Sequence, residues 1–169
     1  ICASNANNVL TDFIKTGIYD RNRPFHTTIS PSMDILISSN LERLLYHLSG
    51  CDDAQIREWF GSLSKTGRYE VTDEVKKAIA DEFYAGCCDD EQTKACIKEI
   101  YDEYLYTCDT HTAVAVKVYK DYAAATGDKT KTVIASTASP YKFSGSVLAA
   151  IGKDTNADEF GLVDELAEV

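Results

Sequence analysis

The chain has 169 residues, 44% of them hydrophobic and 26% charged, which is typical of one soluble globular domain with a hydrophobic core. Its formal net charge of -10 argues against a nucleic-acid partner, because phosphate neutralisation needs clustered lysine and arginine side chains. No apolar run approaches the length of a membrane span, so we expect no membrane partner either.

The six cysteines show neither the spacing of a disulfide framework nor a CxxC pair. We therefore expect reduced thiols in a cytoplasmic protein, and no metal site. The only methionine is Met33, so we expect a chain that is processed or cut from a longer polypeptide. Residues 1–3 resemble the tail of a strand that is already under way.

The first third of the chain predicts helices separated by polar turns. A helix over residues 5–16 ends at Gly17. The amide-rich residues 4–8 either cap that helix or bind an anion at its N-terminus, and capping is the more common role. A short strand is expected over residues 27–29, followed by an irregular polar turn over residues 30–35.

Four further helices are expected before residue 108. One begins at Ser39, which forms a capping box with Glu42 and precedes a run of leucines on one face. The next begins at Asp53, and a third follows an extended link and is capped by Thr72. The fourth spans residues 89–105, and its predicted buried stripe consists of Ile97, Ile100, Tyr101, Tyr104 and Leu105.

The last third predicts a helix, a strand and a second helix. The first helix opens at residues 108–114 and ends at Gly127. The β-branched residues 132–134 indicate a buried strand, and Ser139 with Pro140 starts a helix that runs to Ile151. Strands alternating with helices predict an α/β fold, a parallel sheet flanked by helices. We expect one unit over residues 1–152 and an acidic tail over residues 153–169 with a short helix near Phe160.

Three polar turns are candidate ligand-binding positions: residues 30–34, 109–112 and 136–142. In open α/β sheets ligands lie beyond the carboxyl ends of strands, which is where Ser136 and Thr137 would lie. A capped turn without ligand explains the same pattern, and the pattern alone favours it. Because the helix dipole disfavours a protonated His111, this residue is either a neutral hydrogen-bonding group in a site or a neighbour of an Asp109 cap.

Four stretches of the chain resemble the C-terminal part of threonine synthase, a family of pyridoxal-phosphate enzymes of the tryptophan-synthase-β fold type. They are Ser4-Asn5-Ala6-Asn7-Asn8-Val9-Leu10-Thr11 with Thr16-Gly17; Ser30-Pro31-Ser32-Met33-Asp34-Ile35 with Ser38-Ser39-Asn40-Leu41-Glu42-Arg43; Asp109-Thr110-His111-Thr112-Ala113-Val114; and Ser136-Thr137-Ala138-Ser139-Pro140-Tyr141-Lys142-Phe143. Two positions depart from the family pattern. Thr110 stands where we expect proline, and Ser139 stands where many members carry histidine.

The resemblance implies part of the large domain of a fold type II enzyme that converts O-phospho-L-homoserine and water to L-threonine and phosphate. It implies a cofactor-binding pair, Thr137 with Ser136, in which the Thr137 hydroxyl faces the pyridine nitrogen. That nitrogen would then stay largely unprotonated, which moderates the ring as an electron sink. The candidate substrate-site residues are Ser32, Asp34, Asp109, His111 and Lys142.

The resemblance also implies what this chain lacks. The Schiff-base lysine and the glycine-rich phosphate loop of the family have no counterpart here, so we expect no catalytic residue in the chain, no retained pyridoxal phosphate and no activity. An apolar face exposed by truncation would favour self-association. Two alternatives remain: a non-catalytic α/β ligand-binding or regulatory module, and another fold type II lyase, against which the stretch over residues 30–34 argues.

Overall fold

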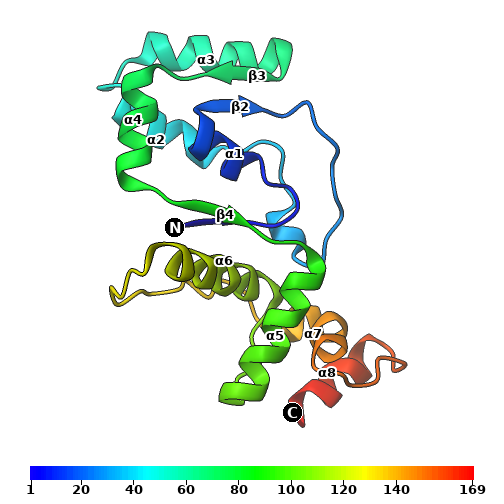
Figure 1. Cartoon of the computed structure of the whole chain (residues 1–169). Helices are drawn as coiled ribbons and strands as arrows, with labels where there is room; N and C mark the ends of the chain where they lie inside the picture. Colours follow the sequence, from blue (N-terminus) through cyan, green and yellow to red (C-terminus); the bar gives the residue numbers. More distant parts are fainter.

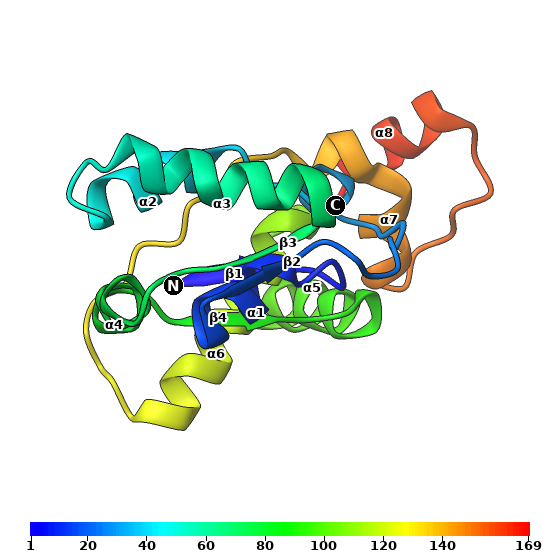
Figure 2. The same cartoon turned by 90° about the horizontal axis from the view of Figure 1, so that it is seen from above.

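A computed structural model describes residues 1–169 and shows two lobes joined by a pair of short strands (Figure 1). The N-terminal lobe holds helices α1 to α4, and the C-terminal lobe holds helices α5 to α8. Viewed from above, α2 and α3 cover one side of the strands, and α6 extends on the other side (Figure 2). The predicted α/β class is confirmed.

Two pairs of three-residue strands give the fold its only sheets. Strand β1 (Cys2–Ser4) pairs in parallel with β4 (Ala85–Cys87), and Ala3 lies opposite Gly86. Strand β2 (Ile18–Asp20) pairs in antiparallel fashion with β3 (Arg68–Glu70). The parallel sheet that the sequence predicts is therefore present, with two strands.

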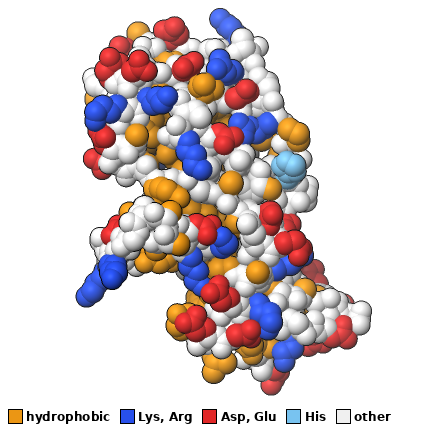
Figure 3. Space-filling model, in the orientation of Figure 1, with side chains coloured by type: hydrophobic (Ala, Val, Ile, Leu, Met, Phe, Trp, Pro, Cys, Tyr) orange, Lys and Arg blue, Asp and Glu red, His pale blue; other side chains and the backbone are white.

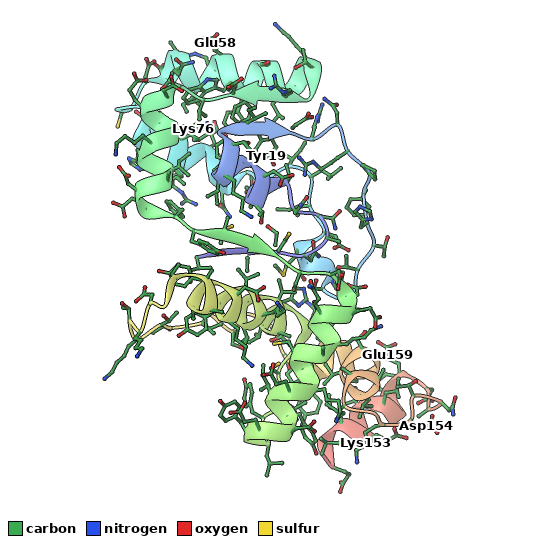
Figure 4. All side chains as sticks on the ribbon, in the orientation of Figure 1. Tyr19, Glu58, Lys76, Lys153, Asp154 and Glu159 are labelled. Carbon is green, nitrogen blue, oxygen red and sulfur yellow. The ribbon has the colours of Figure 1, made fainter.

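The N-terminal lobe has its own hydrophobic core, formed where four helices pack around β2 and β3. These helices are α1 (Val9–Thr16), α2 (Asn40–Leu48), α3 (Asp53–Thr66) and α4 (Asp73–Glu82). Tyr19, labelled at the centre of this lobe in Figure 4, stacks on Tyr69 with ring centroids 5.3 Å apart. Trp59, the only tryptophan, stacks on the same Tyr69 at 6.3 Å.

A second core lies in the C-terminal lobe. It is built from α5 (Asp90–Tyr104), α6 (Thr110–Thr126), α7 (Ser144–Ala150) and α8 (Glu159–Ala167). The Leu166 side chain of α8 packs in this core. Lys153, Asp154 and Glu159 are exposed on the C-terminal lobe (Figure 4). None of the eight helices combines the length and the apolar character that crossing a membrane requires.

The predicted strand over residues 132–134 is absent. No backbone hydrogen bond joins residues 131–137 to another part of the chain, and the Val133 side chain is 95% exposed. A strand needs a neighbour for its N–H and C=O groups, and none lies beside this segment. The predicted strand over residues 27–29 is also absent, because the backbone and side chain of Thr28 bond to Asp34 instead.

Three further expectations at helix ends are wrong. Residues 5–8 are not helical and α1 begins at Val9, since Asn5 and Asn7 bond elsewhere. Ser39 makes no side-chain cap, because its own backbone is already helical at φ −70° and ψ −29°. The stripe of α5 ends early, with Tyr104 64% exposed and Leu105 81% exposed. The cap at Thr72 and the stops at Gly17 and Gly127 are confirmed.

Candidate functional site

A cavity of about 420 Å³ opens between β1 and the N-terminal half of α6. Its walls come from β1, from the 3₁₀ turn η1 (Pro31–Met33), from α6 and from the extended segment over residues 132–137. The lining residues most relevant to chemistry are Ser32, Met33, His111, Tyr119 and Thr137. Three of the four stretches that carry the family resemblance therefore meet at one cavity.

The N-terminus of α6 is fixed by a buried aspartate. Asp109 is 1% exposed, and its carboxylate accepts the backbone N–H of His111 at 2.8 Å and of Thr112 at 3.1 Å. The Thr112 hydroxyl also bonds to this carboxylate. Asp109 thus supplies the acceptor that the free N–H groups of the first helical turn need. It does not line the cavity. Beside it, burial raises the pKa of the Cys108 thiol to about 12, which excludes a thiolate nucleophile here at neutral pH.

His111 links α6 to the η1 turn. The backbone N–H of Ser32 donates to Nε2 of His111 at 3.1 Å, although the residues are far apart in the chain. The imidazole is 6% exposed and packs on the Phe143 ring, with centroids 4.8 Å apart. Lys142 lies outside the cavity lining, with its Nζ 5.8 Å from the same ring.

The residues on both sides of η1 are held by amide side chains that precede α1. Asn5 and Asn7 each donate through Nδ2 to Oδ1 of Asp34, at 2.7 Å and 2.9 Å. The Thr28 hydroxyl donates to the same oxygen at 2.7 Å, and its backbone N–H donates to Oδ2 at 3.0 Å. The amide-rich run does bind a carboxylate, and that carboxylate belongs to this chain.

The segment over residues 132–137 forms the outer wall of the cavity. Thr137 lines it, while the hydroxyl of the neighbouring Ser136 shares a hydrogen bond with Thr112 Oγ1 at 3.0 Å. This bond ties the end of the segment to the first turn of α6. Apart from the half-buried Ile134, the segment is exposed, and its backbone bonds to no other part of the chain.

The structure thus sorts the predicted site residues into two groups. Ser32, His111 and Thr137 line one cavity. The others do not line it and mostly bond to protein groups; they are Asp34, Asp109, Ser136 and Lys142. Sequence reasoning missed Tyr119, which shares a face of α6 with His111 two turns earlier, and it missed the roles of Asn5 and Asn7.

One lining residue of the cavity, Thr137, carries the hydroxyl that the family resemblance assigns to the pyridine nitrogen of pyridoxal phosphate. A hydroxyl such as that of Thr137 can face a pyridine nitrogen without protonating it. No lysine is among the lining residues. No group of three His, Cys, Asp or Glu side chains is arranged to hold a metal ion, and all six cysteines are free.

Comparison with known proteins shows what this chain is similar to. Residues 112–169 match the family model described as threonine synthase, C-terminal. Human threonine synthase-like 1 is 41% identical over 153 residues, which cover 89% of this chain and 20% of that protein. Threonine synthase of Saccharomyces cerevisiae is 35% identical over 168 residues, covering 91% of this chain and 33% of that protein.

The structural comparison agrees with the sequence comparison. The crystal structure of PLP-bound threonine synthase from Brucella melitensis superposes with a TM-score of 0.81 at 33% identity. The match covers 96% of this chain and 34% of the solved one. The chain therefore spans about a third or less of the length of the relatives named here.

Proposed function

Because this chain is homologous to the C-terminal part of threonine synthases, we propose that it forms one wall of the cofactor site in such an enzyme. The complete polypeptide would be a pyridoxal-phosphate-dependent lyase of threonine biosynthesis. It would convert O-phospho-L-homoserine and water to L-threonine and phosphate. The observation that carries this proposal is the meeting of Ser32, His111 and Thr137 at one cavity, although they come from three separate stretches of the sequence.

In this proposal the residues of the chain have distinct tasks. Thr137 faces the pyridine nitrogen of the cofactor. The hydrogen bond between Ser136 and Thr112 keeps Thr137 in place. Pyridoxal phosphate, when bound, supplies the electron sink for the reaction. Ser32 offers the substrate a hydroxyl from the η1 turn. Asp34 and Asp109 hold the surrounding backbone, and Lys142 lies at the border of the site.

The chain alone would neither retain the cofactor nor turn over substrate, since no lysine lines the cavity. The rest of the site would come from the part of the longer polypeptide that its relatives have and this chain does not cover. The backbone of β1 supports this. Cys2 and Ser4 bond to β4 and the residues flanking it, so the alternate residue Ala3 turns its N–H and C=O to the other edge of β1, where no strand pairs with it.

The same open edges favour self-association of the isolated chain. Hydrophobic side chains gather in the recess between the two lobes (Figure 3), and an unpaired strand edge is a ready template for a second copy. We place the complete enzyme in the cytoplasm, in keeping with six unpaired thiols, and expect only a small-molecule substrate as its partner.

The direct test is phosphate release from O-phosphohomoserine by the complete polypeptide. Thr137→Val, which keeps the shape but removes the hydroxyl, should weaken cofactor binding and lower turnover, measured by absorbance titration and a phosphate assay. Thr155→Val is the matched control, because Thr155 is exposed and does not line the cavity. A Thr137→Val enzyme with normal cofactor affinity and turnover would refute the role of Thr137.

A non-catalytic α/β module is the second candidate, and the absence of a lysine from the cavity lining favours it. The coding sequence upstream of Ile1 separates the two functions. A glycine-rich loop and a lysine encoded there support the lyase, whereas a start codon immediately before Ile1 supports the module.

A further inference from the structure

We propose that His111 is a positioning residue: its neutral ring holds the η1 turn at the cavity and takes no part in proton transfer. The inference rests on the proposed function where it concerns turnover. The hydrogen-bonding state of the ring can be measured whether or not that function is right.

The proton of the ring is assigned by its partners. A backbone N–H can only donate, so the bond from Ser32 to His111 requires a lone pair on Nε2. The proton of the neutral ring is then on Nδ1. That atom lies 3.3 Å from Oδ1 of Asp109 and 3.4 Å from Oγ1 of Thr110, both of which can accept.

Both ring nitrogens are therefore committed to protein groups. A general acid or base needs a nitrogen within hydrogen-bond reach of the reacting atom. Nε2 is occupied by Ser32, and Nδ1 lies 3.4 Å from Oγ1 of Thr110 and 3.3 Å from Oδ1 of Asp109, both of which are buried. Phe143 packs on the ring and limits its rotation. His111 thus offers the cavity a fixed surface and no free nitrogen.

The turn that His111 holds is fixed at its other end as well. Asp34 follows η1 directly and accepts hydrogen bonds from Asn5, Asn7 and two groups of Thr28. Bonds to a carboxylate are among the stronger ones in proteins. Ser32 and Met33 line the cavity. Their position depends both on the hydrogen bond to His111 and on the hydrogen bonds to Asp34.

Two substitutions in the complete polypeptide separate positioning from proton transfer. In His111→Gln, Oε1 reaches the place of Nε2 and can accept from Ser32, although the side chain does not titrate. In His111→Asn the shorter side chain cannot reach it. We expect His111→Asn to lower kcat/KM for O-phosphohomoserine on the order of tenfold, the usual effect of one lost hydrogen bond. His111→Gln should recover most of that loss and keep the pH profile of the parent enzyme. If His111→Gln loses as much as His111→Asn, and an ionisation disappears from its pH profile, the ring transfers a proton and the proposal is wrong.

Nitrogen NMR of the histidine rings provides a readout that needs no turnover. With ¹⁵N-labelled histidine in the 169-residue chain, the His111 signal is the one that remains when the exposed His26 and His47 are both replaced by glutamine. We expect a protonated Nδ1 and a bare Nε2 at neutral pH. An Nε2–H tautomer or a doubly protonated ring would overturn the proposal, even if the variants fail to fold. If the parent polypeptide releases no phosphate while the ring shows the expected tautomer, the enzymatic assignment fails and the positioning role stands.

Discussion

Two short stretches of this chain behave against their composition. Residues 85–87 are Ala-Gly-Cys, which are poor strand formers, yet they form β4. Residues 132–134 are Thr-Val-Ile, which are good strand formers, yet they are unpaired and exposed. The difference is the neighbour. β4 lies beside β1, which accepts and donates its backbone hydrogen bonds, whereas the backbone of residues 132–134 bonds to no other segment of the chain. A strand is thus a property of a pair of segments.

Hydrogen exchange should show the largest contrast between the two stretches. The amide of Cys88, which donates to Ser4 at the end of β4, should exchange at least about 10³-fold more slowly than the amide of Val133, since protection follows backbone hydrogen bonding. Exchange measured by NMR on the 169-residue chain checks this. Equal protection at both positions would mean that residues 132–134 pair within the chain after all.

A single added methyl group in β4 should destabilise the fold. A Cβ at Gly86 would lie 2.8 Å from Cγ1 of Val118 on α6, so Gly86→Ala should lower the free energy of unfolding by about 1–3 kcal/mol. Urea denaturation followed by circular dichroism measures the loss. Gly61→Ala is the matched control, because no atom lies within 4 Å of its added Cβ. Relief of the loss in Gly86→Ala with Val118→Ala would identify the contact as the cause.

The N-terminus of α6 is held by the Asp109 cap, whereas the backbone of residues 131–137, after the helix, bonds to no other part of the chain. Asp109→Ala removes the acceptor for the amides of His111 and Thr112 and should lower the free energy of unfolding by about 1–2 kcal/mol. Asp109→Asn keeps an acceptor oxygen and should lose less. The same denaturation assay applies, and equal losses in the two variants would show that the charge, and not the cap, stabilises this turn.

Adjacent thiols at the end of β4 should react at different rates. Cys87 is exposed and Cys88 is 3% exposed, as expected where the chain leaves a strand. Burial raises the pKa of the Cys88 thiol, so less thiolate is present at pH 8, and alkylation should be roughly tenfold or more slower than at Cys87. The Cys88 rate should rise as the pH approaches that raised pKa. Mass spectrometry after brief iodoacetamide treatment reads both sites, and faster labelling of Cys88 would contradict the parallel pairing of β4.

The smallest effect on the free energy of unfolding is expected from a substitution within residues 131–137. Val133→Gly lowers strand propensity but removes an exposed side chain, so the free energy of unfolding of the 169-residue chain should change by less than about 0.5 kcal/mol. In the complete polypeptide, where we propose that a strand pairs with this segment, the same substitution should cost more. A large loss in the short chain would show a contact that residues 131–137 make within it.

Local sequence signals predicted the elements that depend on neighbours close in the chain. Thr72 and Asp109 cap their helices because each needs only the next three residues. The capping box at Ser39 failed because the preceding loop is held from afar, where the Ser38 N–H donates to the Tyr19 hydroxyl at 2.8 Å. No local pattern contains a contact of that kind.

The same limit applies to the candidate site. The three polar turns were found because their residue types are unusual together, but which residues reach the cavity depends on packing between lobes. Asp34 could be identified as polar, yet its bonds to Asn5 and Asn7 cross more than twenty residues of chain. The role of Thr137 came only from the family resemblance, and it stays a prediction until it is tested.

The single tryptophan of this chain gives the N-terminal lobe an optical signal of its own. Trp59 lies in the N-terminal core against Tyr69, so its emission reports the melting of that core alone, whereas far-ultraviolet dichroism averages the helices of both lobes. Coincident thermal curves from the two signals would establish one cooperative unit. Separated curves would establish two cooperative units. Repeating both measurements with a ligand in the cavity would then show which lobe the ligand stabilises.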